Sequence, residues 1–311
     1  MTQLSIPLKE VLKSTLLRIP YFKKVYEAYS SCPWPPGHFY STIPAIEEVE
    51  KNKKRIFENQ TIKDIKMNPE EQFLLAQDLK QYYDSMPFQF DDTKASNLRY
   101  QSKDSFYRFS DAVFLYCFLR HFQPKRIIEV GSGHSSAIML DTNELYFQNK
   151  IKLSFIEPYP EERLNKILRK NDDQCSNIHK NFVQDIDPVF FEALNENDIL
   201  FIDSTHVSKV GSDVNYIFFD VFPVLKPGVL IHIHDIFFPF ELPPKWILEE
   251  KFFWNEIYIL RAFLMNNNDY EIVMFNSFVQ RNQKKWFETN MPICLKGDEF
   301  TGSIWLRKII K

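Results

Sequence analysis

The chain has 311 residues, of which 44% are hydrophobic and 25% are charged, a composition that is ordinary for a globular protein. Its formal net charge of −3 argues against a nucleic acid partner bound through its phosphates. Because no apolar run approaches the roughly 20 residues of a membrane span and no signal-peptide pattern is present, we expect a cytoplasmic protein with reduced cysteines and without a membrane partner.

The first third of the chain predicts a mainly helical extension, residues 1–104. Apolar residues at helical spacing favour helices over residues 11–30 and 45–57. Between them, the prolines and the glycine of the aromatic segment 33–40 exclude regular structure. A further helix is expected to begin after Asn68, because asparagine is a favoured N-cap residue.

The segment after this extension combines a strand, a glycine turn and a helix start. Residues 127–130 predict a buried strand that contains the acid Glu129 near its end. The glycines on either side of Ser132 let the backbone approach a ligand closely, and a helix that starts near Ser135 offers unpaired N–H groups. The segment therefore predicts a nucleotide-like ligand at the carboxyl end of the strand. The alternative is a tight turn with nothing bound.

Acidic residues follow further predicted strands in the same β/α order. Glu157 ends the second strand, Asp185 follows the third, Asp203 ends the fourth and Asp235 ends the fifth. The carboxyl ends of parallel strands meet at one edge of a sheet, so these side chains are expected to face a polar ligand there. An acid at the end of the second strand is suited to bind ribose hydroxyls.

The C-terminal part completes this pattern. A long aromatic-rich helix is predicted over residues 246–265, and strands are predicted over 270–275 and 302–307. The segment 276–301 between those strands is either a second substrate-facing element or a surface loop.

The acid-x-Gly-x-Gly pattern at residues 129–133 resembles the first motif of class I S-adenosylmethionine-dependent methyltransferases. The Lys-Pro-Gly turn at 226–228 is also typical of that family, and the resemblance covers residues 107–311. It implies an α/β fold in a domain over residues 105–311, with a Rossmann-like sheet of seven strands, helices on both faces and an antiparallel last pair. The N-terminal extension would then cover the site.

The resemblance also implies a cofactor and its contacts. S-Adenosylmethionine would place its ribose at the second acid, its adenine near the residue after the third strand, and its amino-acid moiety over the glycine turn. The implied cofactor-binding residues are Glu129, Gly131, Ser132, Gly133, Ser135, Glu157, Asp185 and Asp203.

The ends of the fourth and fifth strands carry a second cluster. Asp203 and His206 match the Asp-x-x-His spacing of macrocin-type sugar O-methyltransferases, in which the Asp binds a metal and the His is the general base. Asp235 matches the second acid of a Glu-Asp pair in that group, whereas His234 stands where Glu is expected. The resemblance implies Asp203 and His206 as catalytic residues and Asp203, His234 and Asp235 as metal ligands. For the metal, the alternatives are Mg²⁺, Mn²⁺ or no metal. For His206, the alternative is a purely structural role.

Together these features imply a methyltransferase that acts on a hydroxyl of a sugar or another small polar metabolite. The first alternative is a metal-independent N- or O-methyltransferase of another small molecule. The second is a non-catalytic module that binds the cofactor, against which the complete set of strand-end acids argues. A homo-oligomer is compatible with the sequence.

Overall fold

The computed structural model describes residues 8–30, 32–58, 61–90, 97–297 and 302–309. The chain forms two compact units, one of Met1–Asn59 with Pro244–Phe253 and one of Gln60–Pro243 with Trp254–Lys311. The predicted boundary between residues 104 and 105 therefore falls inside the second unit. In the described residues, no helix is long and apolar enough to cross a membrane.

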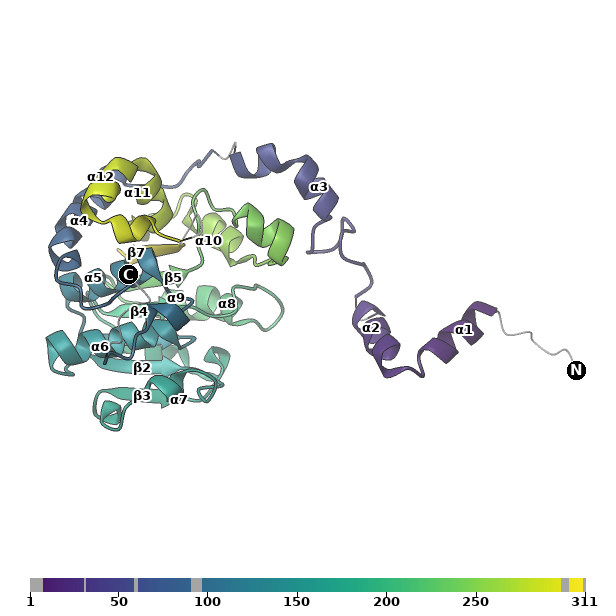
Figure 1. Ribbon diagram of the computed structural model, residues 1–311, viewed down its shortest axis with the longest axis horizontal. Coiled ribbons are helices and arrows are strands. Elements are labelled where there is room, and N and C mark those ends of the chain that lie inside the picture. The colour runs from purple at the N-terminus through teal and green to yellow at the C-terminus, as the bar shows by residue number, and fades with distance from the viewer. Residues whose placement is uncertain (1–7, 31, 59–60, 91–96, 298–301, 310–311) are drawn as a thin grey trace, which may run out of the picture. The chain divides into compact units, whose positions relative to one another are not determined.

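The second unit is built on a mixed sheet of seven strands (Figure 1). The strands are β1 (Arg126–Val130), β2 (Lys152–Ile156), β3 (Ser176–His179), β4 (Ile199–Ile202), β5 (Leu230–His234), β6 (Tyr270–Phe275) and β7 (Ser303–Lys308). Their order is β3-β2-β1-β4-β5-β7-β6, with the first five parallel and β7 antiparallel to both of its neighbours. This arrangement confirms the predicted α/β, Rossmann-like fold and its antiparallel last pair.

Helices surround this sheet. The α-helices of the second unit are α4 (Pro69–Tyr83), α5 (Phe109–Phe122), α6 (His134–Phe147), α7 (Leu164–Ile167), α8 (Asp213–Tyr216), α9 (Phe222–Val224), α10 (Glu256–Leu264), α11 (Asn276–Asn282) and α12 (Lys284–Asn290). Shorter 3-10 or π turns are η2 (Ser102–Asp104), η3 (Asp172–Gln174), η4 (Val183–Asp185), η5 (Pro188–Ala193), η6 (Ile217–Val221) and η8 (Pro292–Leu295). Strands β4 and β5 are buried at every residue, as expected for parallel strands covered on both faces.

The first unit contains helices of its own. These are α1 (Leu8–Leu16), α2 (Pro20–Ser30), α3 (Ile46–Lys51), η1 (Lys54–Glu58) and η7 (Trp246–Glu250). The single helix predicted over residues 11–30 is therefore two helices. The break falls before Pro20, because proline disfavours helical geometry in the residue that precedes it.

The helix predicted over residues 246–265 is also interrupted. Helix η7 is followed by Lys251 in the left-handed conformation, with φ of +63°, and α10 begins only at Glu256. The backbone N–H groups of Asn255 and Glu256 donate to the carbonyl oxygen of His206, each at 3.1 Å. The interruption thus brings the N-terminus of α10 against the loop that follows β4.

The segment between β6 and β7 is neither a loop nor a wall of the cavity described below. Over its described residues it forms α11, α12 and η8, and its side chains Phe287, Met291 and Cys294 are buried in the main hydrophobic core. This segment therefore stabilises the fold; residues 298–301 of the prediction lie outside the described part of the chain.

Candidate functional site

The glycine turn after β1 is shaped by its contact with β4. Gly131 has φ of +78°, and a Cβ atom at this position would lie 1.9 Å from the carbonyl oxygen of Asp203. Glycine is therefore required where the ends of the two strands meet. A Cβ atom on Gly133 would lie 3.6 Å from Arg163, which is an ordinary contact.

Glu129 stabilises this turn through hydrogen bonds to the residues that follow it. Its side chain is fully buried, and its two carboxylate oxygens accept hydrogen bonds from the hydroxyl groups of Ser135 and Ser136. Burial raises the pKa of Glu129 to about 8, although the two serines oppose this shift. Glu129 and Ser135 therefore join the strand end to the start of α6.

The two glycines give a matched test of this packing. We expect Gly131→Ala to lower the free energy of unfolding by at least about 2 kcal/mol, through left-handed strain and the collision with Asp203. Gly133→Ala should cost clearly less, because its Cβ atom has room. Denaturant titrations of the two variants check this, and an equal loss would contradict the packing argument.

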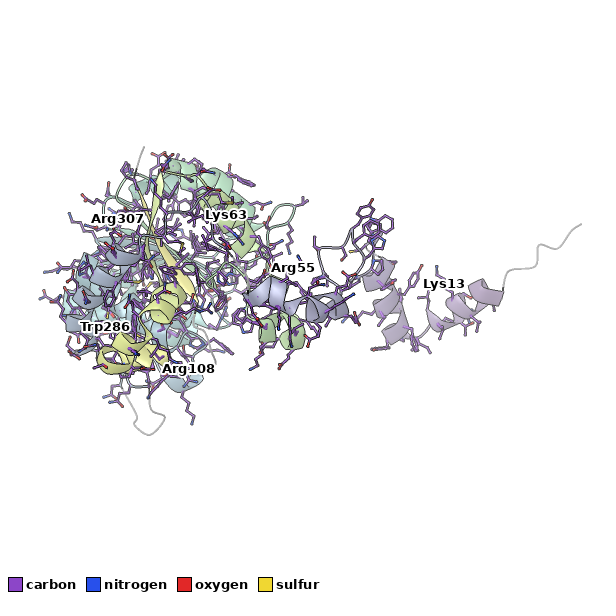
Figure 2. The ribbon with its side chains drawn as sticks, turned by 90° about the horizontal axis from the view of Figure 1, so that it is seen from above. Lys13, Arg55, Lys63, Arg108, Trp286 and Arg307 are labelled. Atoms are coloured by element: carbon purple, nitrogen blue, oxygen red, sulfur yellow. The ribbon has the colours of Figure 1, made fainter. Side chains whose placement is uncertain are left out.

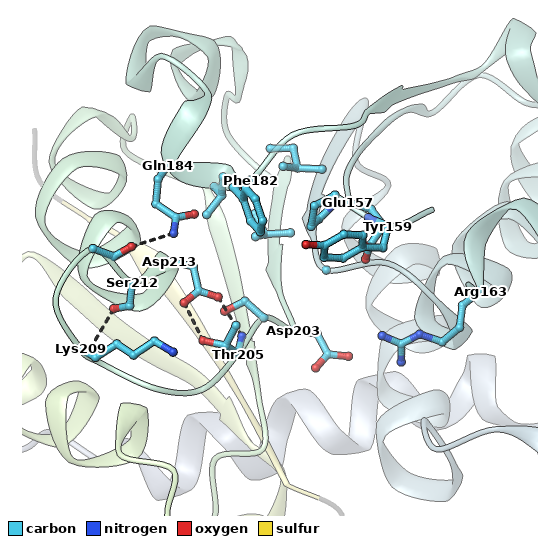
Figure 3. Close-up of a pocket in the computed structure, with 17 residues that line it drawn as sticks. Glu157, Tyr159, Arg163, Phe182, Gln184, Asp203, Thr205, Lys209, Ser212 and Asp213 are labelled. Carbon is cyan, nitrogen blue, oxygen red and sulfur yellow. Dashed lines mark hydrogen bonds between the residues drawn. The ribbon is translucent and has the colours of Figure 1, made fainter. Parts of the chain in front are cut away.

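A cavity of about 410 Å³ opens at the carboxyl edge of the sheet (Figure 3). Its walls are formed by Val130, Gly131, Ile156, Glu157, Pro158, Tyr159, Arg163, Phe182, Val183, Gln184, Asp203, Ser204, Thr205, Lys209, Gly211, Ser212 and Asp213. Of the predicted cofactor-binding residues, Gly131, Glu157 and Asp203 line this cavity, whereas Glu129, Ser132, Gly133, Ser135 and Asp185 do not.

Glu157 is held at the cavity wall by backbone donors. The N–H of Ser132 donates to Oε2 at 3.1 Å, and the N–H of Tyr159 donates to Oε1 at 2.8 Å. These two bonds fix the carboxylate while each oxygen keeps a further lone pair for a ligand. Ser132 thus takes part in the site indirectly, by orienting Glu157.

Gln184 occupies the position that was predicted for Asp185. Its Nε2 donates to the carbonyl oxygen of Gly211 at 2.9 Å, while its buried Oε1 has no hydrogen-bond partner among the described residues. Asp185 is exposed and lies outside the cavity wall. Of the two neighbours, only Gln184 therefore faces the cavity, because the short turn η4 directs one side chain inward and the other outward.

Two basic residues of the wall were not marked by any sequence motif. Figure 3 shows Arg163 and Lys209 extending toward the cavity from opposite sides of Asp203. Arg163 passes beside the glycine turn, since a Cβ atom at position 133 would lie 3.6 Å from its side chain. The cavity therefore offers positive charge as well as carboxylates.

The loop after β4 is anchored on both sides. Asp213 accepts hydrogen bonds from the N–H of Thr205 at 2.9 Å and from its hydroxyl at 2.6 Å. On the other side, the carbonyl of His206 accepts from the start of α10, as described above. His206 and Asp235 both adopt left-handed φ angles, +58° and +55°, which histidine and aspartate adopt more readily than most non-glycine residues.

His206 lies among three carboxylates. Its Nε2 is 3.4 Å from Oδ1 of Asp203 and 3.6 Å from Oδ2 of Asp235, and its Nδ1 is 2.9 Å from Oε2 of Glu256. The ring also packs on Trp254, with 4.7 Å between the ring centroids. Asp203, His206 and Asp235 therefore converge as the strand order predicted.

Glu256 is a member of this cluster that the sequence did not reveal. It is 1% exposed, and its second oxygen, Oε1, has no hydrogen-bond partner among the described residues. Fifty residues separate it from His206, so no local motif links them. A buried acid bound to Nδ1 fixes the ring and leaves Nε2 directed at Asp203 and Asp235.

The charges of the cluster shift its protonation. Burial alone would lower the pKa of His206, but the carboxylates of Asp203, Glu256 and Asp235 raise it well above its ordinary value. Burial likewise opposes ionisation of Asp203, but the charges of His234 and His206 outweigh it and lower its pKa to about 2. The carboxylates around His206 thus favour its protonated form more than water does.

The predicted metal ligands Asp203, His234 and Asp235 do not surround a common point. Nε2 of His206 lies 3.4 Å from Asp203 and 3.6 Å from Asp235, and Nε2 of His234 lies 3.5 Å from Oδ1 of Asp235. In the described part of the chain, no group of three or more His, Cys, Asp or Glu is arranged to hold a metal ion. Nε2 of His206 lies close to a carboxylate oxygen of each aspartate instead.

Comparison with known proteins identifies the domain that carries this site. Residues 128–236 match a family model described as a methyltransferase domain, a range that includes Asp203, His206 and Asp235. An uncharacterized protein of Archaeoglobus fulgidus is 36% identical over 173 residues, covering 53% of this chain and 76% of that relative.

Solved methyltransferase structures are similar at low sequence identity. The SAH-bound methyltransferase PaMTH1 of Podospora anserina is 13% identical, with a TM-score of 0.41 and coverage of 84% of this chain and 94% of that one. The O-methyltransferase TomG of Streptomyces achromogenes, in complex with SAM, is 14% identical, with a TM-score of 0.41 and coverage of 85% and 96%. At such TM-scores, these similarities give no information about the acceptor of this chain.

Proposed function

Because the chain belongs to the class I S-adenosylmethionine-dependent methyltransferases, through its methyltransferase domain at residues 128–236, we propose that it methylates a hydroxyl of a sugar or another small polar metabolite. The observation that carries this proposal is the Glu256–His206 pair, whose Nε2 is directed at the cavity-lining Asp203. A hydroxyl is a poor acid, so its methylation benefits from a positioned base.

On the cofactor side, the cavity supplies complementary groups. S-Adenosylmethionine, when bound, supplies a methyl group on a positively charged sulfur. Glu157 accepts hydrogen bonds from the ribose hydroxyls, and the unpaired Oε1 of Gln184 accepts one from the adenine amino group. Arg163, beside the glycine turn, is placed to pair with the carboxylate of the amino-acid moiety.

On the acceptor side, His206 takes the proton of the hydroxyl. Glu256 holds Nδ1, so that the lone pair of a neutral ring at Nε2 is directed toward Asp203. The surrounding carboxylates make His206 a stronger base than an isolated histidine, at the expense of the neutral fraction at a given pH. Asp203 and Asp235 stabilise the imidazolium that proton transfer produces.

A divalent cation has no part in this proposal. Asp203 and Asp235 are chemically suited to Mg²⁺ or Mn²⁺. However, the ring of His206 lies between them, and His234 is directed to a different oxygen of Asp235. We therefore favour a metal-independent reaction in which His206 takes the proton of the hydroxyl without a bound ion.

The test uses methyl-labelled S-adenosylmethionine with a panel of free sugars, nucleotide sugars and amino sugars. We expect label on an oxygen of at least one hydroxyl compound, and we expect the rate to persist after prolonged EDTA treatment. Label on nitrogen would support the N-methyltransferase alternative. Cofactor binding without turnover on any compound would support a non-catalytic module. Loss of the rate after EDTA treatment would support a metal-dependent reaction.

A further inference from the structure

The first unit begins with two helices whose apolar side chains are exposed. In and just after α1, Val11, Leu12, Leu16 and Ile19 are between 46% and 56% exposed. Helix α2 exposes Tyr21, Phe22, Val25, Tyr26 and Tyr29. Neither helix makes an extensive contact with another described helix or strand of its unit. Eight large apolar side chains within two short helices, with Ile19 between them, form a surface that requires an explanation.

Most of the apolar residues of α2 lie on one side of that helix. Phe22, Val25, Tyr26 and Tyr29 follow the i, i+3, i+4, i+7 spacing of a single helical face. Lys23 and Glu27 lie on the other face of α2, where they form an ion pair at 3.8 Å. Helix α2 is therefore amphipathic.

The same segment is basic, whereas the chain is acidic. Residues 8–30 contain five Lys or Arg and two Glu, a formal charge of +3, while the whole chain carries −3. The residues outside this segment therefore sum to −6. Lys13, labelled in Figure 2, belongs to this group and lies over the ring of Tyr26 at 4.4 Å.

We propose that α1 and α2 dock the chain on an anionic lipid surface, an inference that goes beyond the proposed function and does not depend on it. Short amphipathic helices with Lys and Arg beside Tyr and Phe bind in the interface plane by burying their apolar face. Basic residues add attraction to anionic headgroups. The expectation of no membrane partner was based on the absence of a spanning segment, and surface docking does not need one.

Charge also decides against pairing of these helices between two copies of the chain. Two such segments would bring charges of +3 and +3 together, which opposes association. An anionic lipid surface complements the segment and repels the rest of the chain, so contact is confined to α1 and α2.

Co-sedimentation of the full chain with vesicles tests this proposal. Binding to phosphatidylcholine vesicles that contain phosphatidylglycerol should be at least about tenfold tighter than binding to pure phosphatidylcholine, and it should weaken with salt. Leu12→Asn combined with Val25→Asn should weaken that binding about tenfold or more. Lys23→Gln combined with Lys24→Gln should do the same and remove most of the salt dependence.

Val189→Asn provides the matched control, because Val189 is 63% exposed in η5, outside the first unit. Its vesicle binding should equal that of the wild type. Absent vesicle binding, equal binding to both vesicle types, or an equal effect of the control would overturn the proposal. So would a lipid-free oligomer, seen by sedimentation velocity, that the Leu12→Asn and Val25→Asn variant dissociates, because its apolar faces would then belong to a second copy.

Discussion

Replacing His206 by alanine is expected to lower turnover by roughly 100-fold or more while leaving the affinity for S-adenosylmethionine nearly unchanged. The ring is the base in this account, and it lies outside the residues that line the cofactor cavity. Steady-state turnover and calorimetric titration of the same variant measure the two quantities.

His206→Asn is the companion variant, because His206 has φ of +58° and asparagine tolerates this conformation better than alanine does. It should lose turnover as fully as His206→Ala does while unfolding at a higher temperature. If either variant keeps wild-type turnover and only its melting temperature falls, His206 is a structural turn residue.

Replacing Glu157 by alanine should weaken binding of S-adenosylmethionine by about 1–3 kcal/mol. The carboxylate is fixed by the N–H groups of Ser132 and Tyr159, and its loss removes a charged acceptor at the cavity wall. Isothermal titration of the variant with the cofactor measures this loss.

Asp185→Ala serves as the control for Glu157→Ala, since Asp185 also follows a strand of the sheet but is exposed outside the cavity. Its cofactor affinity should match that of the wild type. A larger effect at Asp185 than at Glu157 would mean that the cofactor does not occupy this cavity.

Much of the fold could be predicted because its signals are local. Strand β1, the glycine turn and the strand-end acids each depend on a few consecutive residues, and parallel pairing then brings Asp203 and Asp235 to neighbouring positions. Gly131 lines the cavity, as predicted for a ligand-binding turn, but its missing side chain also makes room for the carbonyl oxygen of Asp203 after β4, which no sequence pattern specifies.

The remaining parts of the site depend on contacts distant in sequence or on single side-chain directions. Glu256 reaches His206 only because the predicted long helix is interrupted before α10. Gln184 and Asp185 are adjacent, and only the turn η4 determines which of them faces the cavity. The position of the His206 ring beside Asp203 and Asp235 is likewise set by the fold and by no local pattern, and it bears on whether these two carboxylates hold a metal ion.

The pH dependence of methyl transfer tests the role of His206 most directly. A base must be neutral to accept a proton, and Asp203, Asp235 and Glu256 raise the pKa of His206. The rate should therefore rise with pH through an acidic limb that lies above the ordinary histidine value of about 6.5. Glu256→Gln should move that limb to lower pH, because it removes one of the charges that favour the imidazolium. A limb at or below about 6.5 that Glu256→Gln leaves in place would contradict the account.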